Sequence, residues 1–281
     1  MKKVVLCLLL SSFAYFASAQ SDSLVLSKPL WSVNKTTSIG YGAANVYDTY
    51  LSPLKYSGNS YSLLHERLSR THFFDNKLIK QQIFRLNVSV TDNPAKNANE
   101  YSVIGEYRLG AHYPVWKRGK LQVRAGGIWN IGGGVIYNER NSNNPASAKA
   151  FTDLNLSAQT FYRLKGVLLR WQLDLPFVGA FFMPEYGESY YEISLGNRQN
   201  LIHFSSFHNQ RALFNNFSAD FPLSNWTIRL ALQSDYNQTR ANSLTSHIYT
   251  NTFMIGLVSE SLNLGGKKLK KTKIFKSALD D

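Results

Sequence analysis

The sequence predicts an all-β protein, an antiparallel transmembrane β-barrel of about twelve strands within a range of ten to fourteen. Three observations predict this fold. Apolar and polar residues alternate over long runs, short connections alternate with longer ones, and aromatic residues make up 14% of the chain. Alternation directs one face of each strand to lipid and the other to the lumen. Aromatic residues favour strands and form girdles at both membrane interfaces.

The clearest alternation covers residues 120–137. One set of alternate residues is uncharged and includes Val123, Trp129 and Ile131, whereas the other is mostly polar or glycine and includes Arg124 and Asn130. Such a run is much longer than the five or six residues that are common for strands of globular sheets. It therefore favours a membrane-spanning strand over a strand of a soluble β-sandwich.

The same reading divides the chain into strands and connections. The predicted strands are residues 36–47, 59–73, 78–91, 100–113, 120–137, 148–163, 167–180, 189–196, 200–206, 210–222, 225–236 and 246–260. Short turns are expected near 74–77, 114–120, 164–166, 196–199 and 223–225, and longer loops near 48–58, 92–99, 138–147, 181–188 and 237–245. Short turns on one side and long loops on the other are typical of outer-membrane barrels, and an even strand number places both ends on the periplasmic side.

The ends of the chain predict export. Two lysines, a short apolar run and Ala17-Ser18-Ala19 are typical of a secretory signal peptide over residues 1–19. We expect a periplasmic segment at 20–35, the barrel at 36–260 and a solvated basic periplasmic tail at 261–281. Cys7 is the only cysteine, so removal of the signal leaves no thiol for disulfides or catalysis. Together with the predicted barrel, these features place the protein in the outer membrane of a Gram-negative bacterium as an expectation.

Charged residues are expected on the lumen face of the strands. The predicted lumen-lining residues are Glu106, Arg108, Arg124, Asp153, Arg163, Arg170, Asp174, Arg229 and Asp235. They could line an open pore, or they could pair and plug a narrow barrel. Pairing is favoured because buried charges need partners.

Glycine is concentrated in the stretch "AGGIWNIGGGV", residues 125–135. A phosphate-binding loop is not expected, because neither a Lys-Ser/Thr pair nor a helical pattern follows it. Gly126, Gly132 and Gly134 fall on the lumen face, where they leave space beside the strand. Larger side chains or an inward loop are expected to fill that space.

One pair of residues is a candidate for catalysis. His203 and Ser205 are two apart on a predicted strand and share a face, as a base and a nucleophile would, and Asn215, Asn216 or Asp220 could orient the histidine. The pair resembles the H-x-S pair of outer-membrane lipid hydrolases, but the asparagine- and glycine-rich context of the phospholipase motif is missing. We therefore do not expect an enzyme. The histidines show no metal-ligand spacing, and we expect neither a metal nor a cofactor.

The C-terminal half resembles a known family. The segments "ESYYEISLGN" (188–197), "SSFHNQ" (205–210) and "SHIYTNTFMIGLVSE" (246–260) are similar to signal-bearing proteins of unknown function from Bacteroides-like bacteria. The resemblance implies an outer-membrane barrel and no catalytic residues. The chain departs from ordinary barrels because it continues past the last predicted strand into the basic tail.

These features predict a monomeric outer-membrane barrel with a structural role, or one in passage or binding of a small solute. The alternatives are a lipid hydrolase that uses Ser205 and His203, and an accessory barrel of envelope assembly or secretion whose tail docks a periplasmic partner. The net charge of +13, in an exported chain, favours contact with acidic lipid phosphates over nucleic acid. Outer-membrane lipid and lipopolysaccharide are the expected surroundings.

Overall fold

The structure is a computed structural model that describes residues 30–196, 200–223, 226–262, 275–276 and 279. The predicted signal peptide, residues 20–29 of the predicted periplasmic segment and most of the predicted basic tail lie outside these residues. Within the described ranges, no helix has both the length and the apolar character needed to cross a membrane.

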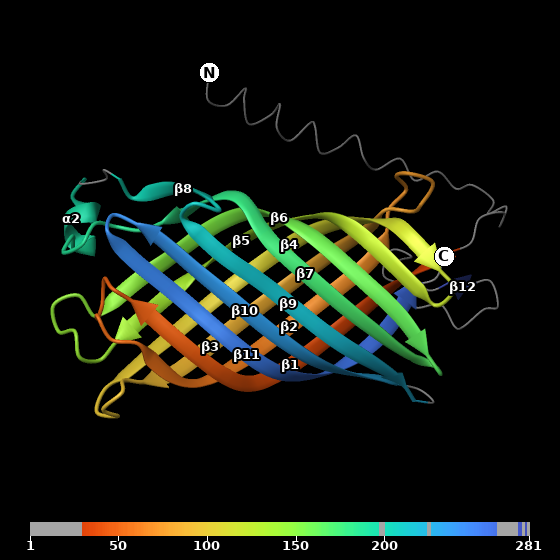
Figure 1. Ribbon diagram of the computed structural model, residues 1–281, viewed down its shortest axis with the longest axis horizontal. Coiled ribbons are helices and arrows are strands. Elements are labelled where there is room, and N and C mark those ends of the chain that lie inside the picture. Colours follow the sequence, from red (N-terminus) through yellow and green to blue (C-terminus); the bar gives the residue numbers. More distant parts are fainter. Residues whose placement is uncertain (1–29, 197–199, 224–225, 263–274, 277–278, 280–281) are drawn as a thin grey trace, which may run out of the picture. The chain divides into compact units, whose positions relative to one another are not determined.

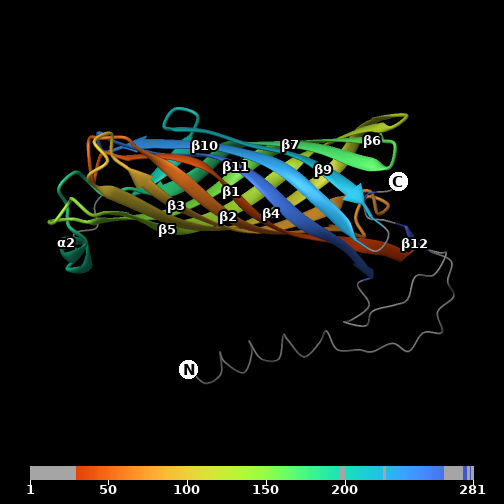
Figure 2. The same ribbon diagram turned by 90° about the horizontal axis from the view of Figure 1, so that it is seen from below.

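Ten long antiparallel strands form a closed barrel in the described part of the chain (Figures 1 and 2). They are β1 (Leu30–Asp48), β2 (Tyr56–Arg70), β3 (Ile79–Asp92), β4 (Asn99–Arg118), β5 (Leu121–Asn138), β6 (Ala146–Leu164), β7 (Val167–Phe182), β9 (Gln210–Pro222), β10 (Thr227–Ala241) and β11 (Leu244–Leu262). The barrel closes because β11 pairs with β1, from Ser32↔Leu262 to Asp48↔Ser246. Closure leaves no free edge along these strands, as a lipid environment requires.

The prediction of about twelve barrel strands is wrong, because two predicted strands are not part of the barrel. Residues 189–196 contain a short helix, α2 (Tyr190–Ser194), whose capping box joins Ser189 and Glu192. The strand predicted at 200–206 is β8 (Ile202–Ser206), which pairs with β7 but lies off the ten-strand circle. A two-residue strand, β12 (Phe275–Lys276), pairs with β1.

The connections define two ends of the barrel. The loop end carries residues 49–55, 93–98, 139–145, 183–196 and 200–209, and the turn end carries residues 71–78, 119–120, 165–166, 223 and 226. The expected long loop at 237–245 is instead a two-residue turn at Asn242 and Ser243. Both residues have positive φ angles, 50° and 60°, as a type I′ hairpin requires. Both β10 and β11 are longer than predicted as a result.

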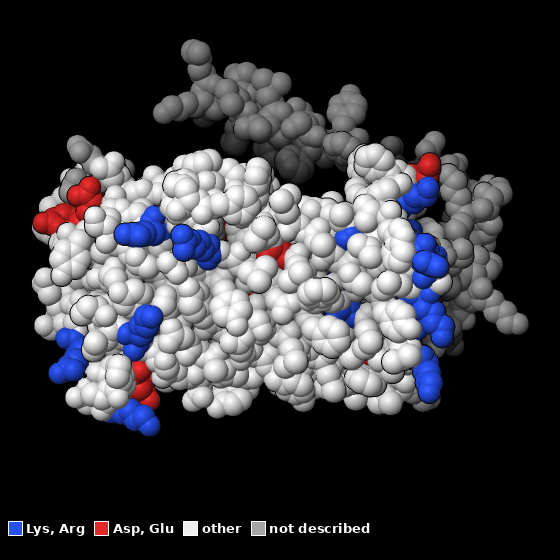
Figure 3. All heavy atoms as spheres, in the orientation of Figure 1, with Lys and Arg blue, Asp and Glu red and all other residues white. Residues whose placement is uncertain are grey.

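Alternation sets the two faces of the wall. On β5, Trp129 and Ile131 are 42% and 45% exposed and face outward, while Asn130 between them is fully buried inside the barrel. On the face that Figure 3 shows, charged side chains gather toward the two ends, and the surface between them is almost entirely uncharged. An uncharged band between two charged ends is the surface that a bilayer requires.

Candidate functional site: the filled lumen

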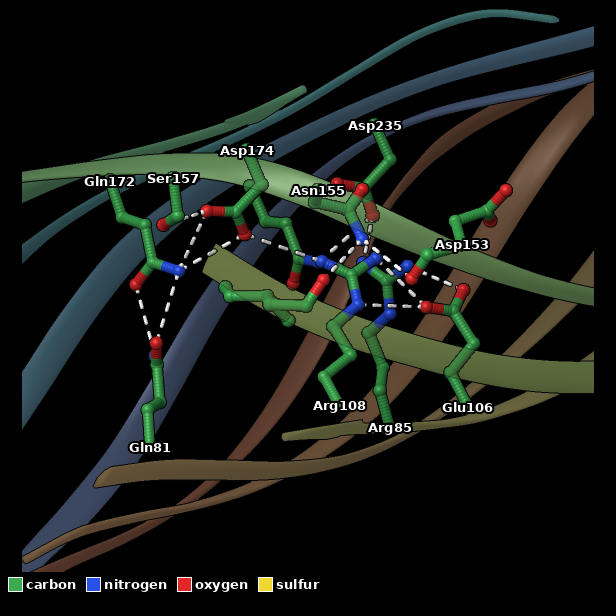
Figure 4. A network of polar contacts seen from close by, with 12 residues as sticks. Gln81, Arg85, Glu106, Arg108, Asp153, Asn155, Ser157, Gln172, Asp174 and Asp235 are labelled. Carbon is green, nitrogen blue, oxygen red and sulfur yellow. Dashed lines mark hydrogen bonds and ion pairs between the residues drawn. The ribbon is translucent and has the colours of Figure 1, made fainter. Parts of the chain in front are cut away.

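A network of charged side chains crosses the lumen (Figure 4). Arg85 on β3 contacts Glu106 on β4 at 2.7 Å and also pairs with Asp235 on β10, on another part of the wall. Glu106 in turn holds Arg108 at 2.8 Å. All four side chains are buried. The charges therefore neutralise one another inside the barrel.

Amide and hydroxyl side chains extend this network. Asp174 on β7 lies 3.6 Å from Arg108, and it accepts hydrogen bonds from Ser157 at 2.5 Å and Gln172 at 3.0 Å. The Gln172 amide oxygen accepts from Gln81 on β3 at 3.0 Å. These bonds join β6 and β7 to β3 through the interior.

Glu66 on β2 is the centre of the remaining contacts. Its carboxylate lies 2.7 Å from Arg170 on β7 and 2.8 Å from Arg229 on β10, and it accepts from Gln81 at 2.6 Å. Arg229 also holds Asp220 on β9 at 2.6 Å. The connected network thus takes side chains from β2, β3, β4, β6, β7, β9 and β10.

An apolar cluster closes the lumen at the loop end. It consists of Val46, Tyr50, Leu51, Ile136, Phe181, Met183 and Leu244. Tyr50 belongs to the 49–55 loop, and its hydroxyl donates to the Glu188 carbonyl oxygen at 2.6 Å. Burial raises the pKa of this tyrosine to about 12. The cluster and this hydrogen bond fasten two loops over the opening.

A second apolar cluster lies at the turn end and consists of Leu68, Ile79, Phe161 and Leu279. Leu279 comes from the C-terminal segment, and its carbonyl oxygen lies 3.5 Å from Arg124 Nη2. The Arg124 guanidinium stacks 4.4 Å from the Phe161 ring centre. An apolar cluster thus lies at each end of the described lumen.

The interior includes two small cavities. The first has a volume of about 70 Å³ and is bordered by the loop-end cluster and by the Arg85 network, with Lys149, Phe151, Phe214 and His247 in its lining. The second, of about 40 Å³, lies against Glu66, Arg108 and Met254. A cavity of about 10–15 Å³ holds one water molecule. Each of these two cavities therefore has room for no more than a few small molecules.

The predicted lumen residues are distributed as follows. Eight lie buried inside the barrel: Glu106, Arg108, Arg124, Asp153, Arg170, Asp174, Arg229 and Asp235. Arg163 is exposed, because it lies at the turn end one residue before β6 ends.

Sequence reasoning missed Glu66, Gln81 and Arg85. In β3, Gln81 and Arg85 have the opposite parity to the outward Phe84, so the alternation of the sequence already indicated that both point inward. The inward direction of Glu66 was harder to recognise, because the apolar Leu64 on the same strand also points into the barrel.

The three glycines that were predicted to face the lumen have different neighbours. A Cβ atom at Gly132 would lie 2.5 Å from the Phe151 ring, which occupies the space beside it. At Gly126 and Gly134 a Cβ atom would meet the backbone carbonyl oxygens of Ala111 and Val103 on β4. One glycine makes room for an aromatic ring, and the other two allow close approach of the neighbouring strand.

The candidate catalytic residues are not assembled as a triad. Ser205 is fully buried, and its hydroxyl donates to Asp153 at 3.4 Å. His203 Nε2 instead lies 3.0 Å from the Met183 carbonyl oxygen. Asn216 is placed opposite Gln172 on β7, whereas Ser205 is opposite Gly179. Seven positions along one strand correspond to roughly 23 Å.

The other proposed orienting groups are also engaged elsewhere. Asn215 accepts a hydrogen bond from the outward Trp171 at 2.7 Å, and Asp220 pairs with Arg229. Within the described residues, no group of three or more His, Cys, Asp or Glu side chains is arranged to hold a metal ion.

The fold is similar to solved outer-membrane barrels. The outer membrane protease OmpT from Escherichia coli is 10% identical with a TM-score of 0.42, over 82% of this chain and 96% of that one. The transport unit of the autotransporter AIDA-I from Escherichia coli is 10% identical with a TM-score of 0.42, over 91% of this chain and 97% of that one. An outer membrane channel from Pseudomonas putida F1 is 11% identical with a TM-score of 0.35, over 83% of this chain and 97% of that one.

These likenesses concern the fold alone. A comparison with curated proteins finds no match. A family described as "Protein of unknown function (DUF3316)" matches residues 2–268, which is nearly the whole chain. The chain therefore belongs to this family of unknown function, DUF3316.

Proposed function

We propose that the protein is a monomeric outer-membrane β-barrel with a closed lumen, and that it binds a small polar solute in the loop-end cavity without conducting it. One observation carries this proposal: the network around Glu66, Arg85 and Arg170 joins seven of the ten barrel strands through the interior. The uncharged outer band supports a place in a bilayer (Figure 3). We place the turn end in the periplasm, because short turns face that side in bacterial barrels.

The network opposes opening because its members neutralise one another. Removing one partner of a buried ion pair costs about 3–5 kcal/mol, since the other charge is left without compensation. A solute that passed through the lumen would have to separate several such pairs at once. Thermal fluctuation of a single side chain would not create a path.

The size and lining of the loop-end cavity indicate the class of solute. Its volume of about 70 Å³ lies between the space for one water molecule and the roughly 150 Å³ cavity that accepts benzene. Arg85, Glu106 and Lys149 supply charges of both signs, and Phe151 and Phe214 supply aromatic surface. We infer a solute of a few non-hydrogen atoms that carries polar groups.

Conductance in a planar bilayer tests closure. The wild-type chain is expected to insert and show no steady open level. The variant Arg85→Ser/Asp235→Ser removes both charges of one cross-lumen pair and is expected to show more frequent brief openings than wild type, because fewer pairs then have to separate for an ion to pass. Lys80→Ser/Asp92→Ser is the matched control, because it removes a charge of each sign from the outer face of the same strand. A steady wild-type conductance would contradict the closed lumen.

Thermal unfolding in detergent tests solute binding. Small zwitterions and carboxylates of up to about six non-hydrogen atoms are added in turn, because a ligand that binds only the folded state raises its stability. Ser102 is buried and lines the cavity, so Ser102→Leu is expected to fill it and abolish any stabilisation. Stabilisation that survives in Ser102→Leu would place the solute elsewhere.

A further inference from the structure

An apolar groove runs over the outer face of the barrel across β11, β1, β2 and β3. Its volume is about 930 Å³, and its lining includes Ile39, Leu63, Leu86, Phe253 and Leu257. These strands are neighbours around the point where the barrel closes. Outward side chains in the lining are largely exposed, so the groove is open to whatever surrounds the protein.

Two cations stand beside the groove toward the turn end. Lys35 on β1 is the cross-strand neighbour of Arg67 on β2, two positions beyond the pair Thr37 and His65. All four side chains lie on the outward parity of their strands, the same parity as the groove residue Ile39. Thr37 and His65 contact each other at 2.9 Å. The groove therefore has a basic margin at one end.

Like charges directly opposite each other on neighbouring strands are destabilising. Within the described residues, neither Lys35 nor Arg67 forms an ion pair with a carboxylate, and Arg67 Nε is buried without a hydrogen-bond partner. The pair thus places two positive charges side by side. An anion between the two side chains would remove the repulsion.

The opposite end of the groove is bounded by tyrosines. The rings of Tyr41 and Tyr61 lie 5.4 Å apart, and the Tyr41 hydroxyl donates to Asn59 at 2.9 Å. This bond holds the hydroxyl at the loop-end side of the groove, and both tyrosines are among its lining residues. The groove is therefore cationic at one end, apolar along its length and aromatic at the other.

We propose that the groove binds one phospholipid of the periplasmic leaflet, with its phosphate between Lys35 and Arg67 and its acyl chains along Ile39, Leu63 and Phe253. The proposal rests on the proposed outer-membrane function, which places the turn end beside that leaflet. Arginine recognises phosphate through parallel hydrogen bonds, and lysine adds a point charge. The apolar lining of the groove suits acyl chains, which a free phosphate ion lacks.

A second copy of this chain fits the groove less well. A symmetric dimer would use the same patch on both copies. It would bring two Lys35 and two Arg67 side chains together, and the described residues of the patch offer no carboxylate to neutralise them. The phospholipid removes this repulsion, whereas the dimer increases it.

Native mass spectrometry of the full chain in mild detergent tests the site. Phosphatidylglycerol is compared with diacylglycerol of the same chains, which lacks the phosphate. We expect one phosphatidylglycerol per chain and at least about tenfold weaker retention of diacylglycerol, because hydrogen bonds to charged groups are worth about 1.5–3 kcal/mol. Lys35→Ala/Arg67→Ala is expected to reduce phosphatidylglycerol to the level of diacylglycerol.

Two further variants separate charge from shape. Lys120→Ala/Lys165→Ala removes two cations from exposed turns at the same end, away from the groove, and is expected to retain the lipid. Leu86→Trp fills the groove without a change of charge and is expected to weaken both lipids. Each variant is accepted only if it keeps heat-modifiable migration on gels, which reports a folded barrel.

Two outcomes would overturn the proposal. One is equal phosphatidylglycerol retention by wild type and Lys35→Ala/Arg67→Ala, and the other is dimer formation through the groove. A barrel that inserts into bilayers but retains no phospholipid overturns this site and leaves the proposed function intact. A chain that fails to insert into bilayers contradicts the proposed function itself.

Discussion

Arg170 Nη1 lies 2.7 Å from Glu66 Oε2, which ties β7 to β2 through the interior of the barrel. These strands are not neighbours in the wall, since β3 to β6 separate them on one side. The same carboxylate holds Arg229 at 2.8 Å. One side chain thus compensates two buried guanidinium groups.

Replacement of Glu66 by alanine is therefore expected to destabilise the barrel strongly. Arg170 would lose its carboxylate, while Arg229 would keep Asp220. Loss of one partner from a buried pair costs about 3–5 kcal/mol. Urea unfolding of the purified protein in detergent micelles measures the change. The matched control is Asp92→Ala, which removes an exposed carboxylate and is expected to change stability by less than about 0.5 kcal/mol.

Much of the barrel wall was predictable because strand alternation is local. The expected faces of β5 are confirmed by outward Trp129 and buried Asn130, and all ten barrel strands lie where alternation predicts one. Residues 189–196 were misassigned for a local reason as well. Ser189 and Glu192 have the spacing of a helix capping box, and that signal outweighs the short alternation around it.

The pairing inside the lumen could not be predicted in the same way. Which inward residues meet depends on the number of strands and their stagger, and these set the barrel width. With two extra strands in the predicted barrel, Arg85 and Asp235 would not face each other as they do. Alternation indicates that a residue points inward, but it carries no information about a partner 150 positions away.

The glycines of β5 give a second prediction, because Gly132 and Gly134 face different obstacles. A methyl group at Gly132 meets the Phe151 ring, which can turn aside, whereas at Gly134 it meets the Val103 backbone carbonyl. We expect Gly134→Ala to cost more than Gly132→Ala, with overpacking of about 1–3 kcal/mol as the scale. Chemical denaturation in detergent micelles measures both.

Phe151→Leu supplies the control for this comparison. The smaller side chain is expected to restore stability to Gly132→Ala and to leave the stability of Gly134→Ala unchanged. Phe151 lies beside Gly132 but is not among the nearest neighbours of Gly134. Failure to rescue Gly132→Ala would instead identify Glu106 as the obstacle, because its Cγ lies 2.9 Å from the added Cβ. Equal rescue of both variants would contradict a contact specific to Gly132.

The loop-end cap gives a prediction in pH. Burial raises the pKa of Tyr50 to about 12, from an ordinary value of about 10. A folded pKa above the unfolded one means that the contribution to stability is complete below about pH 10 and is lost as the pH rises toward 12. Tyrosinate absorbance of wild type minus Tyr50→Phe is therefore expected to show a single group that titrates near 12.

Tyr50→Phe should also lose about 1 kcal/mol of stability below pH 10, because the Glu188 carbonyl oxygen loses its hydrogen-bond donor. Tyr186→Phe, at a largely exposed tyrosine, is expected to leave stability unchanged. A difference titration centred near 10 would mean that the Tyr50 hydroxyl is in contact with water and that the cap does not cover the lumen.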